Sequence, residues 1–515
     1  MNCLTKDMIT RSPGMESDTK SLRYYFGLAL AVLLLAVANL HIGQSEFGGY
    51  DLSVVIDSGW RVMNGQIPNL SFISTLPPSL YLLVAAAFRV FGVNWFAILI
   101  TESLLYLLFC FLGLRLCWLL RSVRGNSRER YLPFIYIAAQ SLLLLSVNHL
   151  YHSTMAIRVA TYSILATYTL IRQTSSAQRA REATAHVGFS FAFLLLCKPN
   201  TAWAALLFCI LCLAMDRRLW LPALQAVVAA AVVDAALLAV FHISFYNAFV
   251  GYFGVSNRAV PRMFFPGSSI PDGPVLLTYG LLVYPAIKII QIIWQDRSRE
   301  WASSTVLLVV SAALVSLIGF GTNWDLKIVD VPPFLIGAAI LADTNAERYK
   351  RLIRPLLWSC SLFLIFATYM GVDRFRMKAV GPWAGPTYGP LITIHDQFFG
   401  DFKARQVFAE ILSQVDIVSK SVAGQKIFFG PRMEFLYARN GFVSPAHVPV
   451  WWHPGTSYPL SLEPTVDKAW EDDNFDVLIF AKNDRTRFPG ILRGFIRMNY
   501  IQDMSFKAID VFYRR

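Results

Sequence analysis

The segment that decides the fold is Tyr50-Asp-Leu-Ser-Val-Val-Ile-Asp-Ser-Gly-Trp-Arg-Val-Met-Asn-Gly-Gln-Ile-Pro68, which continues to Pro77-Pro78. It is the first polar segment after the first apolar run of the chain. Within about one loop's length it holds Asp51, Asp57, Arg61 and an Asn64-Gly65 turn signal. We interpret the rest of the chain as a membrane scaffold around this segment and a domain that covers it.

The composition of the chain indicates a membrane protein. Of its 515 residues, 55% are hydrophobic and only 15% are charged, and the apolar residues come in repeated runs. The longer runs suffice to cross a hydrocarbon core of roughly 30 Å, so we expect a polytopic α-helical membrane protein. The net charge of +13 would also suit a nucleic-acid partner. In a membrane protein, however, Lys and Arg gather in cytoplasmic loops, so we expect the lipid bilayer and no nucleic acid as partner.

The amino-terminal segment, residues 1–23, is polar and precedes an apolar run at 24–40. Its basic residues predict that it is cytoplasmic and that the first helix leads outward. Ala36-Val37-Ala38 fits a signal-peptidase site, but the polar leader is long for a signal peptide. We therefore expect the first helix to be retained.

The later apolar runs predict about 11 spans in total, with the amino terminus in the cytoplasm and the carboxyl terminus outside. Besides 24–40, the expected spans are the runs 95–120, 131–150, 154–171, 219–243, 275–294, 303–320, 334–341 and 356–369, and two helices within 187–215. The run 79–91 has only about 13 residues and is too short to span. We expect it to form an interfacial or re-entrant helix.

The run at 187–215 is interrupted by Lys198-Pro199-Asn200. A single helix would hold a proline and a charge near the middle of the membrane, which is costly. Two short helices that meet at an outward-facing turn satisfy the charge rule better. This interpretation places Lys198 on the same side of the membrane as Asp51.

The composition changes after residue 371. Residues 372–515 mix charges with short strand-like runs at 426–429 and 476–480 and a helix-like stretch at 404–418. We predict a soluble extracytoplasmic α/β domain here, after a transmembrane domain at 24–371. None of the seven cysteines falls in this domain, so a disulfide framework is excluded.

The order of Asp51, Arg61, Asn64-Gly65-Gln66 and Pro77-Pro78, followed by Val90-Phe91-Gly92, resembles the first outer loop of GT-C glycosyltransferases. These are multi-span enzymes that use polyprenyl-phosphate-linked sugars. The similar branch contains the protein O-mannosyltransferases, the lipid A aminoarabinose transferases and the lipopolysaccharide-core galacturonosyltransferases.

The resemblance implies a glycosyltransferase of the bacterial inner or plasma membrane that acts in building the cell envelope. Its donor would be a polyprenyl-phosphate sugar, and its extracytoplasmic acceptor a lipid such as lipopolysaccharide, a glycan or a protein. The predicted outer loop at 43–78 would be catalytic. Asp51 matches the family's first acidic position, which implies the role of catalytic base on the acceptor hydroxyl.

Two positions depart from the family pattern: Leu52 replaces the second acidic residue, and Leu76 replaces a lysine that meets the donor phosphate before Pro-Pro. Because negative charge grows on the departing phosphate, a cation is needed there. Lys198 is our first choice, with snorkelling to the interface as its alternative. Arg61 and Arg89 are further candidates, although Arg61 could instead pair with Asp57 four residues earlier on a short helix.

Acceptor-binding candidates come from the outer loops and the carboxyl-terminal domain. Aromatic side chains beside a histidine and a Pro-Gly turn suit stacking on sugars, or docking of the domain on the membrane helices. The predicted set is Asp57, Arg258, Arg432, Glu434, Trp451, Trp452 and His453.

Other polar residues carry weaker signals. Asp325 and Asp330 could join Asp51 around a divalent metal, but no ligand spacing specifies a site, so we predict neither metal nor cofactor. His149 and His152 fit interfacial histidines better than ligands. Asp234, within an apolar run, could mark a proton path, but a buried hydrogen-bond partner is the commoner role.

Two other functions stay open. A transporter or flippase for a lipid-linked glycan would also need many spans and outward-facing cations, but no internal repeat is evident and the predicted chain ends in a large outer domain after an odd number of spans. A non-catalytic assembly subunit would explain the departures at Leu52 and Leu76.

Overall fold

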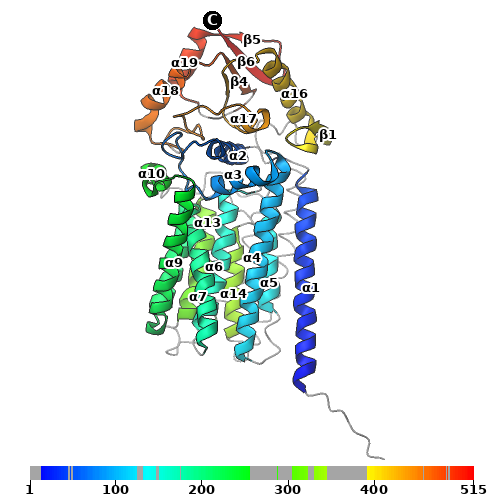
Figure 1. The fold of residues 1–515 in the computed structure, drawn as a ribbon, viewed down its shortest axis with the longest axis vertical. Helices are drawn as coiled ribbons and strands as arrows, with labels where there is room; N and C mark the ends of the chain where they lie inside the picture. Colours follow the sequence, from blue (N-terminus) through cyan, green and yellow to red (C-terminus); the bar gives the residue numbers. More distant parts are fainter. Residues whose placement is uncertain are drawn as a thin grey trace, which may run out of the picture.

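The computed structural model has a bundle of long helices with a mixed α/β domain at one end, and short helices lie between the two (Figure 1). The structure describes residues 13–44, 47, 50–124, 131–145, 150–173, 176–255, 287, 291, 304–322, 330–344, 391–455, 457–482, 484, 486 and 488–515.

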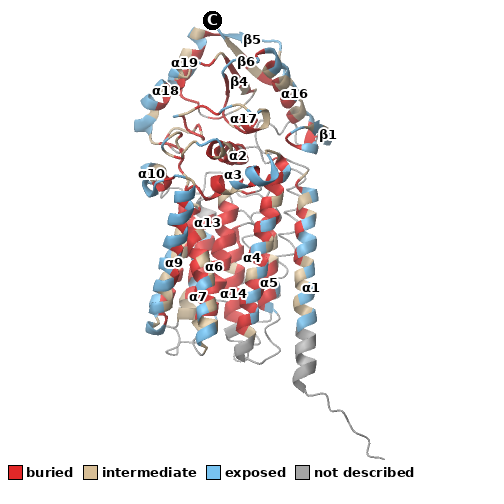
Figure 2. Cartoon of the chain, viewed as in Figure 1, coloured by how far each residue is buried: buried red, intermediate tan, exposed pale blue. Residues whose placement is uncertain are grey.

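The bundle is organised around α6 (His152–Arg172), which is buried along nearly its whole length. Figure 2 shows the buried faces of the neighbouring helices turned toward the bundle centre. The other bundle helices are α1 (Pro13–Ile42), α4 (Trp95–Arg124), α5 (Tyr131–Leu142), α7 (Ala177–Leu196), α8 (Pro199–Ala214), α9 (Trp220–Val240), α13 (Ser304–Thr322) and α14 (Pro332–Thr344). Short 3-10 turns follow α5 at Leu143–Leu145 and precede α9 at Arg217–Leu219.

Four described helical segments are long and apolar enough to cross a membrane: Leu22–Ile42, Trp95–Arg121, His152–Arg172 and Arg217–Val240. Shorter apolar helices accompany them, such as Pro199–Ala214. The predicted helical membrane fold is thus confirmed. The count of about 11 spans and the sides of the two termini stay predictions, and the runs 275–294 and 356–369 fall largely or wholly outside the described residues.

Three short helices lie at the end of the bundle that faces the α/β domain: α2 (Tyr50–Met63), α3 (Ser79–Phe91) and α10 (Phe245–Val255). The short helix predicted at 79–91 is confirmed with the same bounds. Helix α2 takes up 14 residues of the predicted loop at 43–78, because its apolar residues pack on α3. Gly59 permits this close approach, since a Cβ there would lie 2.3 Å from Val84 Cγ1.

The carboxyl-terminal region has the predicted α/β character. Its main sheet has the strand order β3-β4-β6-β5, in which β3 (Ile427–Phe429) and β4 (Val477–Ala481) are parallel, while β6 (Ile509–Arg514) runs antiparallel to β4 and to β5 (Tyr500–Asp503). A separate hairpin joins β1 (Leu391–Asp396) and β2 (Gly400–Arg405). Helices α16 (Gln406–Ser421), α17 (Phe435–Asn440), α18 (Glu463–Asp472) and α19 (Gly490–Asn499) and the 3-10 turn Leu460–Leu462 complete it.

The carboxyl-terminal region is joined to the segment after α2. Residues 71–73 hydrogen-bond the 447–450 segment: Ile73 N donates to Val448 O at 3.1 Å, and Val450 N donates to Ile73 O at 3.1 Å. The Phe47 ring packs on Trp95 and on the rings of Phe399, Phe408 and Phe435 of the carboxyl-terminal region, at centroid distances of 4.8 to 5.6 Å. The two regions therefore share one hydrophobic core.

Candidate functional site

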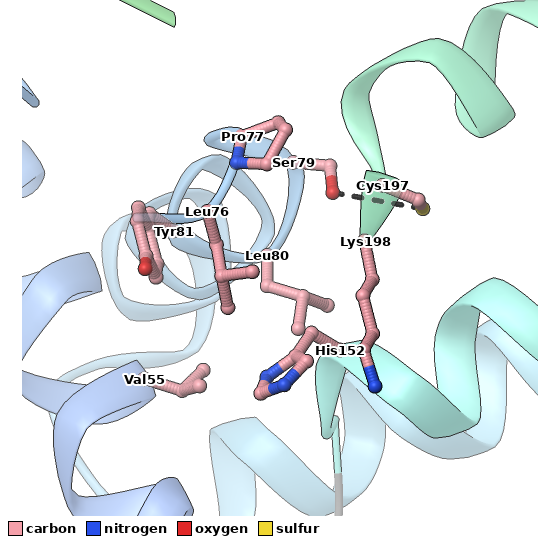
Figure 3. Close-up of a pocket in the computed structure, with 9 residues that line it drawn as sticks. All are labelled: Val55, Leu76, Pro77, Ser79, Leu80, Tyr81, His152, Cys197 and Lys198. Atoms are coloured by element: carbon pink, nitrogen blue, oxygen red, sulfur yellow. Dashed lines mark hydrogen bonds between the residues drawn. The ribbon is translucent and has the colours of Figure 1, made fainter. Parts of the chain in front are cut away.

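A small pocket opens where α2, α3, the start of α6 and the break between α7 and α8 meet. Most of its lining side chains are apolar, and Lys198 brings a cation to it (Figure 3). The lining residues are Val55, Leu76, Pro77, Ser79, Leu80, Tyr81, His152, Cys197 and Lys198.

The break that presents Lys198 follows from Pro199. The residue before a proline is disfavoured in the helical conformation, and Lys198 has φ −50° and ψ 115°. Pro199 then occupies the first helical position of α8, where its missing N–H costs nothing. The predicted break between two helices is thus confirmed, although α7 begins at Ala177, ten residues before the predicted run. Lys198 Nζ donates to Ser153 Oγ at 2.9 Å, and Figure 3 shows the ammonium directed toward His152.

Leu76 lies on the α3 side of the same pocket, so this residue and Lys198 line one space although 122 positions separate them. The loop that carries Leu76 is tied down by hydrogen bonds. The Ser74 hydroxyl lies 2.8 Å from the Tyr81 hydroxyl and donates to Leu76 O at 3.2 Å. The Asn69 side chain accepts from Ser74 N at 2.9 Å and donates to Asn247 O of α10 at 2.8 Å. The wall opposite Lys198 is therefore well ordered by its own chain.

Asp51 is the second residue of α2 and precedes the pocket residue Val55 by one helical turn. Residues four apart lie on the same face of a helix. The Asp51 side chain itself lies outside the described part of the structure.

Asp57 and Arg61 form a buried ion pair, with Arg61 Nε 2.6 Å from Asp57 Oδ2. The predicted alternative for Arg61 is therefore the observed arrangement. The guanidinium also donates to the carbonyl of Pro445 and to Gln66 Oε1, and the Ser444 hydroxyl donates to Asp57 Oδ1 at 2.5 Å. Burial raises the pKa of Asp57, although Arg61 and the Ser444 hydroxyl act to lower it.

Glu434 is buried where α17 meets α2. Ser53 Oγ donates to Glu434 Oε2 at 2.7 Å and accepts from Phe435 N at 3.1 Å. Arg432 N donates to Glu434 Oε1 at 2.8 Å, with Arg432 in the left-handed region at φ 71°. Burial raises the pKa of Glu434 to about 8. Asp57 and Glu434 thus take part in the junction between α2 and the carboxyl-terminal domain.

The predicted residues Trp451, Trp452 and His453 lie in three different places. The Trp451 ring meets the His152 ring edge-on, with centroids 5.6 Å apart, so Trp451 reaches the pocket rim. Trp452 is 2% exposed and packs on Phe428 in the aromatic core of the domain. His453 follows in the turn that Ser457 N closes on its carbonyl at 2.8 Å.

Arg89 is exposed at the end of α3, with its guanidinium 5.8 Å from the centroid of the Phe241 ring, and it does not line the pocket. The predicted residues Arg258, Asp325 and His149 lie outside the described residues. Within the described ranges, no group of three or more His, Cys, Asp or Glu side chains is suited to a metal ion.

His152 is a titratable pocket residue that the sequence pattern did not assign to a ligand site. It enters the pocket because the start of α6 meets α3 and the α7–α8 break there. The signal that could have indicated it is its place just before Ser153 in the first turn of a helix on the same side as Lys198.

Comparisons with known proteins give a match in fold. No protein-family profile and no curated protein matches the chain in sequence. The crystal structure of ArnT from Cupriavidus metallidurans in the apo state aligns over 95% of this chain and 98% of that one, with 11% identity and a TM-score of 0.51. The structure of the same protein bound to undecaprenyl phosphate aligns over 96% and 98%, with 12% identity and a TM-score of 0.44. ArnT is a lipid A aminoarabinose transferase, so the predicted GT-C resemblance is confirmed at the level of the fold.

Proposed function

We propose that this chain is an integral membrane glycosyltransferase of the GT-C type, which transfers a sugar from a polyprenyl-phosphate donor to an extracytoplasmic acceptor. The observation that carries the proposal is the shared pocket of Leu76 and Lys198. The likeness to the fold of ArnT supports the enzyme class. The acceptor would be a lipid, a glycan or a protein of the cell envelope.

Lys198 would bind the donor phosphate. In the related family a lysine before Pro-Pro serves this purpose, and here that position is Leu76. A cation presented from the opposite wall of the same pocket would supply the missing charge. An ammonium beside the departing phosphate stabilises the transition state more than the ground state, because negative charge grows on the leaving oxygen.

Asp51 would act on the acceptor. Its carboxylate would take the proton of the acceptor hydroxyl while that oxygen bonds to the anomeric carbon and the bond from this carbon to the phosphate oxygen breaks. The phosphate leaves with the electron pair of the broken bond, next to Lys198. Such a direct displacement inverts the configuration of the sugar. The place of Asp51 one turn before Val55 supports this role.

Trp451 is our leading candidate for contact with the acceptor or with the sugar, because it packs against His152 at the pocket rim. An aromatic face suits the apolar side of a pyranose ring. His453 follows as a second candidate in the adjoining turn. Arg61, Asp57 and Glu434 instead serve the domain junction, where hydrogen bonds within the chain occupy their polar groups.

The test is sugar transfer in membranes that contain the full chain and a labelled pool of polyprenyl-phosphate sugar. Lys198→Gln should lower the rate of transfer by about 100-fold, the loss typical for removal of one transition-state contact. The swap Leu76→Lys with Lys198→Leu should recover part of it, because both positions line one pocket. Lys426→Gln, an exposed lysine of the outer domain, is the matched control.

The outcomes separate the candidate functions. Wild-type transfer from the Lys198→Gln variant would overturn the phosphate assignment. Movement of the lipid-linked sugar across the membrane without any transfer, by the wild type, would favour the transporter. Transfer that persists in Asp51→Asn would remove Asp51 as the base.

A further inference from the structure

Helix α10 contacts the break between α7 and α8 that presents Lys198. The Tyr252 hydroxyl of α10 donates a hydrogen bond to Asn200 Oδ1 at 2.6 Å, and both residues are half-buried. Asn200 is the second residue of α8 and follows Lys198 by two positions. A hydrogen bond from a separate helix therefore holds the first turn of α8, at the point where the chain brings Lys198 to the pocket.

The Tyr252 ring adds a second contact with α8, through Trp203. The two ring centroids lie 5.2 Å apart and the ring planes make an angle of 69°, which is an edge-to-face arrangement. The Trp203 indole in turn donates to the carbonyl oxygen of Leu195, in the last turn of α7, at 2.9 Å. Trp203 thus connects α8 to the end of α7, and Tyr252 packs on the residue that makes this connection.

The same helix supports the opposite wall of the pocket. Asn69 Nδ2 donates to the carbonyl oxygen of Asn247 in α10 at 2.8 Å. Gly251 approaches Ser74 so closely that an added Cβ would lie 1.7 Å from the Ser74 carbonyl oxygen. Ser74 precedes the pocket residue Leu76 by two positions. Helix α10 therefore contacts the segments that carry both walls.

We propose that Tyr252 is a positioning residue for Lys198, because its hydrogen bond to Asn200 fixes the start of α8 and with it the place of the ammonium. The neighbouring Gly251 packs on the opposite wall, so α10 sets the position of Lys198 relative to that wall. A misplacement of about 1 Å at a reacting centre can lower a rate by about 100-fold. This inference rests on the proposed function, in which Lys198 binds the donor phosphate.

The expected effect is on turnover. Tyr252→Phe removes only the hydroxyl and keeps the ring against Trp203. Loss of this one neutral hydrogen bond should lower kcat by about tenfold, because the start of α8 is then held less firmly. The fall in kcat should exceed any rise in KM for the donor, since the ammonium stabilises the transition state more than the ground state.

The experiment is a double-mutant cycle on sugar transfer in membranes that contain the full chain, with a labelled polyprenyl-phosphate sugar as donor. Tyr252→Phe is measured in the wild type and together with Lys198→Gln. If Tyr252 acts through Lys198, the tenfold loss should disappear where the ammonium is absent. A purely structural role would lower transfer in both backgrounds. The matched control is Tyr246→Phe, the same change at a tyrosine of α10 that is 72% exposed, which should transfer as the wild type does.

Asn200→Leu provides a second variant from the other side of the contact. It removes the acceptor and should reproduce the loss of kcat, with no further loss when it is combined with Tyr252→Phe.

Two results would overturn the inference and leave the phosphate assignment intact, provided that Lys198→Gln is impaired. One is wild-type transfer by Tyr252→Phe, and the other is an equal loss from this change with and without Lys198. Wild-type transfer by Lys198→Gln would instead remove the phosphate assignment, and the inference with it.

Discussion

The two faces of helix α2 differ in what they contact. On one face Ser53, Asp57 and Arg61 bond to the carboxyl-terminal domain through side chains and carbonyls at close range. On the other face Val55 borders a mostly apolar pocket, and the cation there, Lys198, comes from a distant break between two helices.

This difference separates the residues that stabilise the fold from the residues that line the pocket. Asp57 and Arg61, two of the charged residues in the segment after the first helix, are bound by other groups of the same chain and hold the domain in place. Lys198 instead reaches the pocket from outside this segment, so its position and not its neighbours in the sequence makes it a candidate for a ligand. A conspicuous cluster of charges in a sequence is therefore a poor guide to a substrate site until its partners are known.

The largest effect should follow from breaking the buried ion pair. Arg61→Met leaves Asp57 buried without its cation and should lower the free energy of unfolding by about 3 to 5 kcal/mol. The measurement is unfolding in detergent, followed by circular dichroism. The matched control is Arg115→Met, which breaks an exposed pair with Glu182 and should cost about 1 kcal/mol or less. Equal losses in both variants would contradict the buried character of the junction.

The next effect concerns pH and Glu434. Because burial raises the pKa of this carboxyl from its ordinary 4.5 to about 8, the folded protein favours the protonated form. The resulting stability is fully present below about pH 4.5 and is lost as the pH rises through about 8. Glu434→Gln should remove this dependence of stability on pH. Thermal unfolding of wild type and variant across the window measures it, and parallel curves for the two proteins would speak against the assignment.

A smaller effect should follow from removing one hydrogen bond of the junction. Ser444→Ala deprives the buried Asp57 carboxylate of a donor at 2.5 Å, which should cost about 1 to 3 kcal/mol of unfolding free energy. Ser461→Ala, at an exposed serine of the same domain, is the control and should leave stability nearly unchanged. A Ser444 variant as stable as the control would show that solvent replaces the hydroxyl.

The smallest effect on stability is expected in the pocket, where the effect on activity should be largest. Lys198→Gln removes one hydrogen bond to Ser153 and should change the free energy of unfolding by about 1 kcal/mol or less. The same unfolding assay, on the protein used for the transfer measurements, checks this. A large decrease in the free energy of unfolding would mean that Lys198 also stabilises the fold.

The parts of the fold that were predictable have local causes. The helix Ser79–Phe91 ends where its apolar run ends, and the break before Pro199 follows from the ring of that proline. Strands at 427–429 and 477–481 follow from short apolar runs. The ion pair of Arg61 with Asp57 was also predictable, because residues four apart on a helix are neighbours.

The parts that were not predictable depend on distant packing. Neither Ser53 nor Glu434 carries a signal for its partner, which lies 381 residues away. The helical state of α2 likewise depends on its contact with α3, whereas the polar residues and turn signal of the segment predict a loop. His152 lines the pocket together with residues of α3 and the α7–α8 break, and no pattern within α6 reveals these neighbours.

The bond between Ser53 and Glu434 also has a consequence for biosynthesis. A ribosome that adds roughly 5 to 20 residues per second needs about 20 to 80 s to make the 381 residues between them. Throughout this interval helix α2 is already made, while the domain that supplies partners to Ser53, Asp57 and Arg61 does not yet exist. A nascent chain that stalls between residues 345 and 433 would therefore carry the described helices of the bundle and still lack Glu434, Ser444 and Pro445, the partners of α2. Completion of the carboxyl-terminal domain thus acts as the last step of maturation for the first helix that the pocket needs.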